Sequence, residues 1–136
     1  MVEQKYIDFI EHLIKQTKEK KLHWQYLDEN EKLYQAMGWT TTKIVYDFFA
    51  KGEEKIYADF NKEDSFYVKR DNVFIVIHVY GNNPADLYVV PNTYKKVVKI
   101  LSHEYGEYIT RLLNIVQSQF PDGEKFIDDL LKLISN

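Results

Sequence analysis

The sequence predicts an α+β fold, in which an antiparallel β-meander of four to six strands is packed by an N-terminal helix and a C-terminal helical pair. Three observations predict it. Apolar residues recur at helical spacing near both ends of the chain. Short runs of β-branched and aromatic residues occupy the middle and are separated by turn-forming residues. The length of 136 residues is close to the commonest size of one domain, so residues 1–136 are expected to form a single α+β domain.

A first helix is expected over residues 2–20. Its apolar stripe recurs every three or four positions and consists of Tyr6, Phe9, Ile10, Leu13, Ile14 and Thr17. Residues 22–27 then alternate apolar and polar side chains, which favours a strand.

Residues 28–64 are the least legible part of the chain. Residues 29–37 fit a short helix that Gly38 would stop. Residues 41–49 are rich in β-branched and aromatic side chains, which favours extended structure. Helical spacing of Ile44, Val45, Phe48 and Phe49 leaves a helix as the alternative there.

The clearest β unit covers residues 65–91. Residues 65–70, 73–80 and 86–91 are predicted as three strands. Asp71 and Asn72 supply a two-residue turn, because both residue types tolerate a positive φ, and residues 81–85 supply a longer loop. Residues 94–101 are either a further edge strand or the turn that leads into the next helix.

Two helices are expected at the C-terminal end. Ser102 fits an N-cap, and helical spacing of apolar residues then continues to Phe120. Pro121 and Gly123 break the chain. A last helix over residues 124–134 carries its apolar residues on one face: Phe126, Ile127, Leu130, Leu131 and Ile134.

The predicted turns fix which strand residues face each other. The first turn pairs Arg70 with Val73, Val68 with Ile75, and Phe66 with Ile77. The longer loop pairs Tyr80 with Asp86, Val79 with Leu87, and Ile77 with Val89. Side chains alternate along a strand, so one face of the meander is almost wholly aliphatic and should pack on helices.

The other face mixes aromatic rings with hydrogen-bonding groups, which a binding surface needs. Its candidate partner- or ligand-binding residues are Tyr67, Phe74, His78, Tyr80 and Tyr88. In the alternative, further helices or loops cover this face too and give a three-layer domain. His78 itself fits either a ligand or proton-transfer group, or a histidine satisfied at the margin of the core.

Several classes of protein are disfavoured. The absence of cysteine excludes disulfide scaffolds, thiolate nucleophiles and cysteine-ligated metal sites. His103 and Glu107 could share one face of a helix, but no third ligand accompanies them, so no metal is expected. No phosphate-binding glycine loop or catalytic signature occurs, so no cofactor and no catalytic residue is assigned.

Charge and hydropathy narrow the partners. The net charge of −3 makes nucleic acid an unfavoured partner, and the lysines at positions 15, 18, 20 and 21 are interpreted as a solvated helix end. Charges throughout residues 1–20 argue against a secretory signal, and no run approaches the roughly 18 apolar residues of a membrane span. A cytoplasmic protein that does not contact membrane is therefore expected.

These features favour a small non-enzymatic protein that acts through protein–protein interaction, of the inhibitor, immunity or adaptor type. Eleven tyrosines support this expectation, because tyrosine is favoured at interfaces. The excess of Lys, Ile, Asn, Tyr and Phe over Gly, Ala and Arg is also typical of an AT-rich bacterial or phage genome. The alternative is a small-ligand or nucleotide-binding domain that uses the aromatic face of the sheet.

Overall fold

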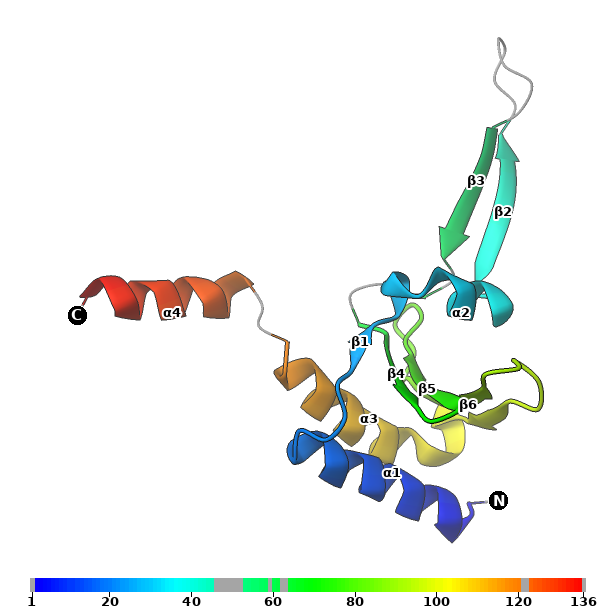
Figure 1. Cartoon of the computed structure of the whole chain (residues 1–136), viewed down its shortest axis with the longest axis horizontal. Helices are drawn as coiled ribbons and strands as arrows, with labels where there is room; N and C mark the ends of the chain where they lie inside the picture. The colour runs from blue at the N-terminus through cyan, green and yellow to red at the C-terminus, as the bar shows by residue number, and fades with distance from the viewer. Residues whose placement is uncertain (1, 46–52, 59, 62–63, 121–122, 136) are drawn as a thin grey trace.

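The computed structural model describes residues 2–45, 53–58, 60–61, 64–120 and 123–135, and within these ranges its side chains are described outside residues 40–58, 123–126 and 135 (Figure 1). It confirms the α+β fold. In chain order its elements are α1 (Gln4–Lys18), β1 (Gln25–Tyr26), the 3-10 helix η1 (Leu27–Glu29), α2 (Glu31–Ala36), β2 (Thr40–Val45), β3 (Glu53–Ala58), β4 (Phe66–Arg70), β5 (Val73–His78), β6 (Asp86–Pro91), β7 (Val98–Ile100), α3 (Ser102–Ser118) and α4 (Gly123–Ser135).

The main sheet has five antiparallel strands in the order β1-β4-β5-β6-β7, and β2 and β3 form a separate hairpin. The first predicted turn is confirmed. Arg70 pairs with Val73, Val68 with Ile75 and Phe66 with Ile77. Asp71 adopts a φ of +54°, which a tight two-residue turn requires and which aspartate tolerates.

The second turn differs from the prediction by two residues. Asp86 pairs with His78 rather than Tyr80, and Leu87 pairs with Ile77, so the loop spans residues 79–85. The reason is that Val79 leaves the ladder. Its C=O accepts from the Asn61 N–H at 2.6 Å and from the Ser65 hydroxyl at 3.1 Å, and its N–H donates to Ser65 Oγ at 2.9 Å. A shift of two residues keeps every side chain on its predicted face.

Helices α1 and α3 lie together on the aliphatic face of the sheet (Figure 1). The core between them and the sheet includes Ile10, Leu13, Phe66, Ile77, Leu87, Ile109 and Leu112. Polar groups in this layer are bonded. The Trp24 indole N–H donates to Thr17 Oγ1 at 3.0 Å, and the Glu3 N–H donates to the Tyr105 hydroxyl at 2.8 Å.

The second face of the sheet is covered as well, as the three-layer alternative expects. Its cover comes from η1, α2 and the residues that follow them. Leu27, Leu33, Trp39 and Phe60 pack there with four sheet residues, which are Phe74, Val76, Tyr88 and Val90. Asn30 begins α2, because its side-chain oxygen accepts from the Leu33 N–H at 3.1 Å.

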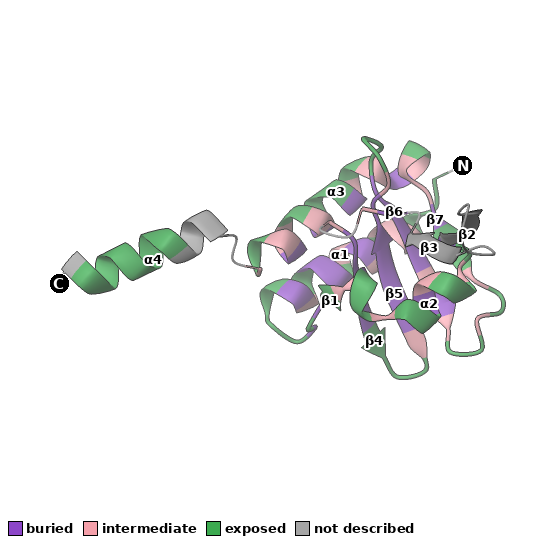
Figure 2. Cartoon of the chain, turned by 90° about the horizontal axis from the view of Figure 1, so that it is seen from above, coloured by how far each residue is buried: buried purple, intermediate pink, exposed green. Residues whose placement is uncertain are grey.

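Helix α4 forms as predicted but projects from one end of the molecule (Figures 1 and 2). Its apolar side chains at positions 127, 130, 131, 133 and 134 are exposed, so the expected packing of the helical pair is wrong for this helix. The reason lies in α3. Its apolar residues already face the core, and Thr110, Arg111 and Asn114 on its other side are exposed and offer no apolar surface.

Other element boundaries shift slightly. Of the strand predicted over residues 22–27, only β1 is regular, and the extended segment predicted over 41–49 is β2 as far as Val45, while residues 46–49 lie outside the described part. Of the two alternatives for residues 94–101, an edge strand or a turn, the strand is present as β7. Helix α3 begins at Ser102, whose place as N-cap is taken by Leu101. Among the described residues, no helix combines the length and the apolar character that crossing a membrane needs.

Candidate functional site

One edge of the main sheet is only partly covered. Strand β1 pairs with Phe66 and Tyr67 of β4 and reaches no further. The Leu27 N–H donates to the Ser65 C=O at 2.9 Å, so the odd-numbered residues of β4 bond toward β1. Lys69 therefore directs its backbone N–H and C=O toward the edge that β1 leaves open.

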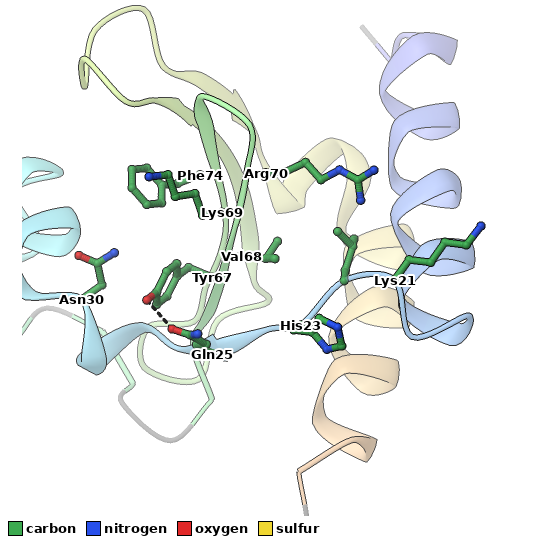
Figure 3. Close-up of a pocket in the computed structure, with 10 residues that line it drawn as sticks. Lys21, His23, Gln25, Asn30, Tyr67, Val68, Lys69, Arg70 and Phe74 are labelled. Carbon is green, nitrogen blue, oxygen red and sulfur yellow. Dashed lines mark hydrogen bonds between the residues drawn. The ribbon is translucent and has the colours of Figure 1, made fainter.

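A pocket of about 490 Å³ lies at this open edge, between β4 and the segment that leads from α1 into β1 (Figure 3). Its volume falls within the range of about 300–1,000 Å³ that is typical of small-molecule sites. The lining residues come from the α1–β1 segment, from η1's end and from the β4–β5 hairpin. They are Lys21, Leu22, His23, Gln25, Asn30, Tyr67, Val68, Lys69, Arg70 and Phe74.

The charged groups of the pocket are all basic. Lys21, Lys69 and Arg70 line it, and none of the ten lining residues is acidic. Lys21 also forms an ion pair with Glu19, whose carboxylate lies 3.0 Å from the lysine ammonium, and the bond to Lys21 lowers the pKa of Glu19. The chain as a whole has a net charge of −3, so the three basic lining residues form a locally positive site that would attract an anion.

The two sides of the pocket differ in chemistry. Tyr67, Lys69 and Phe74 lie toward α2, whereas Arg70, His23 and Lys21 lie toward α1 (Figure 3). Tyr67 and Phe74 are 6.2 Å apart between ring centroids, and the Lys69 ammonium lies 5.7 Å from the Phe74 ring. The pocket thus has an aromatic end and a cationic end.

Tyr67 is held in place by its neighbour in β1. Its hydroxyl donates to Gln25 Oε1 at 2.6 Å, across the pair that joins β1 to β4. This bond fixes the orientation of the ring that forms one wall of the pocket. Phe74, only 8% exposed, supplies the more buried wall.

The five residues predicted as a site divide into two groups. Tyr67 and Phe74 line the pocket. His78 and Tyr80 lie at and beyond the far end of β5, and Tyr88 lies on β6, across Val76 from Tyr67. His78 is buried, stacked on Trp39 at 3.9 Å between ring centroids and on Tyr80 at 5.0 Å. Both faces of the imidazole are therefore covered by rings.

Asp86 connects this aromatic group to the helix layer. Its carboxylate accepts from the Tyr80 hydroxyl at 3.0 Å and from the Ser102 N–H at 2.7 Å. The hydrogen bond to Asp86 raises the pKa of Tyr80, and burial, followed by the charge of Asp86, raises the pKa of Tyr88. These contacts bind parts of the fold together, and none opens onto the pocket.

The sequence does not predict the cationic end of the pocket. Its pattern places Lys69 on the same face as Tyr67 and Phe74, interprets Lys21 as part of a solvated helix end, and gives His23 and Arg70 no binding role. The available signal was their position: Lys69 and Arg70 end a predicted strand just before a tight turn, where side chains stand at a sheet edge. How much of this strand its partner strand covers depends on the fold and not on the local sequence.

The lining of the pocket limits the chemistry it can offer. Its lining offers donors, cations and rings but neither a carboxylate nor a serine hydroxyl. Within the described residues, no group of three or more His, Asp and Glu side chains could hold a metal ion. Comparisons with protein-family models, curated proteins and solved structures found no match to this chain.

Proposed function

We propose that this protein is a non-enzymatic binding protein whose edge pocket receives a small anion bearing an aromatic ring, of which a nucleotide is the representative. The single observation that carries the proposal is the pairing of an aromatic end with a cationic end in one pocket of about 490 Å³.

Each end contributes a distinct interaction. An aromatic ring of the ligand placed beside Tyr67 gains a stacking interaction. The Lys69 ammonium, which lies over the ring of Phe74, would also favour a ligand ring with an electron-rich face. A phosphate placed toward Arg70 gains a charge-assisted, two-pronged hydrogen bond. The backbone N–H of Lys69, directed toward the part of this edge that β1 does not cover, is a further donor for such a ligand.

The test compares a whole ligand with its two halves. Isothermal titration calorimetry with ADP, adenosine and inorganic pyrophosphate measures the three affinities at low ionic strength. ADP should bind at least about ten-fold more tightly than either half, and added salt should weaken it because the contacts are partly exposed. Equal affinity for pyrophosphate and ADP would reduce the pocket to a simple anion site, and no binding of ADP at millimolar concentration would refute the proposal.

A second candidate function is protein–protein interaction, which the sequence alone favours. The observation that supports it is the exposed apolar face of α4, where Leu133 and Ile134 are 76% and 79% exposed. Amphipathic helices commonly bind by laying such a face into an apolar groove of a partner. An inhibitor, immunity or adaptor protein would use α4 in this way.

A further inference from the structure

A row of aromatic rings leads out of the edge pocket across the second face of the sheet. Phe74 of β5 lies 6.2 Å from Tyr67 of β4 and 6.2 Å from Tyr94, which follows β6, both measured between ring centroids. Because β5 lies between β4 and β6 in the sheet, Phe74 is the middle ring of the row. Tyr67 and Tyr94 are half-buried, and Tyr94 does not line the pocket.

Exposed lysines accompany these rings. The Lys69 ammonium lies 5.7 Å from the centre of the Phe74 ring, and the Lys32 ammonium of α2 lies 6.0 Å from that of Tyr94. Figure 3 shows Lys69, Tyr67 and Phe74 together on the side of the pocket that faces α2. Two further exposed lysines, at positions 95 and 96, follow Tyr94 in the chain. We call the following five residues the ring–lysine row: Tyr67, Lys69, Phe74, Tyr94 and Lys32.

The acidic side chains near α2 act on the opposite side of that helix from Lys32. Burial, followed by the charges of Glu31 and Asp28, raises the pKa of Tyr34. Tyr34 and Lys32 are two residues apart, so about 200° separates them around α2. Glu31 also accepts a hydrogen bond of 2.7 Å from the Gln35 side chain. The row is therefore locally positive, although the chain as a whole carries a net charge of −3.

The loop between β6 and β7 holds Tyr94 in a defined position. The Tyr94 N–H donates to the Pro91 C=O at 2.8 Å, and its φ of +61° is uncommon for a residue other than glycine. Its ring lies within 9° of parallel to the Phe74 ring. A ring that is already ordered loses little conformational entropy when a ligand stacks on it.

We propose that the ring–lysine row binds single-stranded nucleic acid, with one nucleotide in the edge pocket and a neighbouring base stacked on Tyr94. The inference rests on the proposed function and deepens it, because it names a polymer of nucleotides as the ligand of the same pocket. Proteins that bind single strands combine aromatic side chains, on which successive bases stack, with cations that follow the phosphates. A free nucleotide in the pocket would leave Tyr94 and Lys32 without a contact, because neither lines it.

Fluorescence anisotropy of a labelled oligothymidylate of about 12 nucleotides, a length within the range of known single-strand sites, tests the inference at low ionic strength. The competitors are ADP, a duplex of the same length and inorganic polyphosphate of similar charge. The single strand should bind at least about ten-fold more tightly than each of them, because only an unpaired strand offers successive bases for stacking. An oligouridylate of the same length then shows whether the row prefers DNA or RNA.

Two variants at Tyr94 separate the ring from its structural role. Tyr94→Leu keeps an apolar side chain beside Phe74 but removes the aromatic face, whereas the matched control Tyr94→Phe keeps that face. Tyr94→Leu should weaken binding of the strand by about ten-fold and leave ADP binding unchanged, because Tyr94 lies outside the pocket. Tyr94→Phe should bind both ligands as the wild type does.

The salt dependence of strand binding tests the lysines without altering a ring. Lys32→Gln should reduce the slope of log K against log salt concentration by about 0.7, the contribution of one phosphate contact on a single strand. Lys5→Gln is the matched control, because the Lys5 ammonium also lies over a tyrosine ring, 5.1 Å from the centre of Tyr6, but on α1 in the other layer. Its slope should equal that of the wild type.

The outcomes distinguish this inference from the function on which it rests. A strand that binds no more tightly than ADP or polyphosphate would overturn the inference, and measured ADP binding would still support the proposed function. Strand binding that Tyr94→Leu and Lys32→Gln both leave unchanged would likewise overturn the ring–lysine row as the site. Absence of binding by both ADP and the strand would refute both proposals.

Discussion

Asp86 accepts a hydrogen bond of 2.7 Å from the backbone N–H of Ser102, the first residue of α3. The two residues are 16 positions apart in the sequence. Asp86 belongs to β6 and is only 4% exposed. Leu101 occupies the N-cap position without a side-chain bond, so Asp86 supplies from the sheet the acceptor that a local cap normally provides.

Replacing Asp86 by alanine should therefore destabilise the fold by about 2–3 kcal/mol, because a charge-assisted bond at a helix N-terminus is lost and the Tyr80 hydroxyl loses its acceptor. Urea unfolding followed by circular dichroism measures the change. Tyr80→Phe, which keeps the bond to Ser102, should cost about 1 kcal/mol. A larger loss for Tyr80→Phe than for Asp86→Ala would contradict the capping role.

Three tyrosines, two of them near Asp86, predict how stability responds to alkaline pH. The pKa values of Tyr34, Tyr80 and Tyr88 are all raised above the ordinary value of 10.0. The folded state thus holds these protons more tightly than the unfolded chain, and their contribution is full below pH 10 and is lost as pH rises through the folded values. Unfolding free energies measured from pH 8 upward should fall above about pH 10. Tyr80→Phe should lessen that fall, and an identical slope in the variant would argue against the bond to Asp86.

The two C-terminal helices should respond differently to the same substitution. Leu112 of α3 is fully buried, so Leu112→Ala should cost about 2–5 kcal/mol through lost burial and a cavity. Leu130 of α4 is 44% exposed, so Leu130→Ala should cost less than about 1 kcal/mol at low protein concentration. Denaturant unfolding of both variants decides, and similar large losses would place α4 in the core.

Tyr88 should behave as a core residue despite its polar group. It is 9% exposed, and its ring meets those of Trp39 at 5.1 Å and His78 at 5.9 Å between centroids. Tyr88→Ala should therefore cost about 3–5 kcal/mol, the usual range for a buried large aromatic side chain. Thermal unfolding tests this, and a near-neutral effect would mean that the second face of the sheet is accessible.

Much of the fold could be predicted from the sequence because its signals are local. The Asp71-Asn72 turn is encoded by two residues that tolerate positive φ, and the apolar stripe of α1 by its own spacing. The second turn differs from the prediction because Val79 bonds to Ser65 and Asn61. Both residues lie in the segment before β4, far from Val79 in the sequence. The cover over Tyr88 depends on Trp39, from a segment whose pattern has no single period.

The candidate site was less predictable for the same reason. Alternation along β4 and β5 identifies Tyr67 and Phe74 as neighbours on one face. The same alternation also places His78 and Tyr88 on this face. In the structure, however, Trp39 packs on both of them, and neither lines the pocket. The pocket exists because β1 begins only at Gln25 and pairs with no residue of β4 beyond Tyr67. No local signal in the sequence marks where the pairing of two strands ends.

The most direct test of the central claim is the dissociation constant of ADP for Arg70→Ala beside the wild-type protein. Arg111→Ala is the matched control, because it removes the other arginine of the chain, which pairs with Glu11 at 2.8 Å away from the pocket. Calorimetry should show binding weakened by about ten-fold or more in Arg70→Ala, since a charge-assisted bond to phosphate is worth about 1.5–3 kcal/mol, and unchanged binding in Arg111→Ala. Equal affinity of wild type and Arg70→Ala would contradict the assignment of the edge pocket as the binding site.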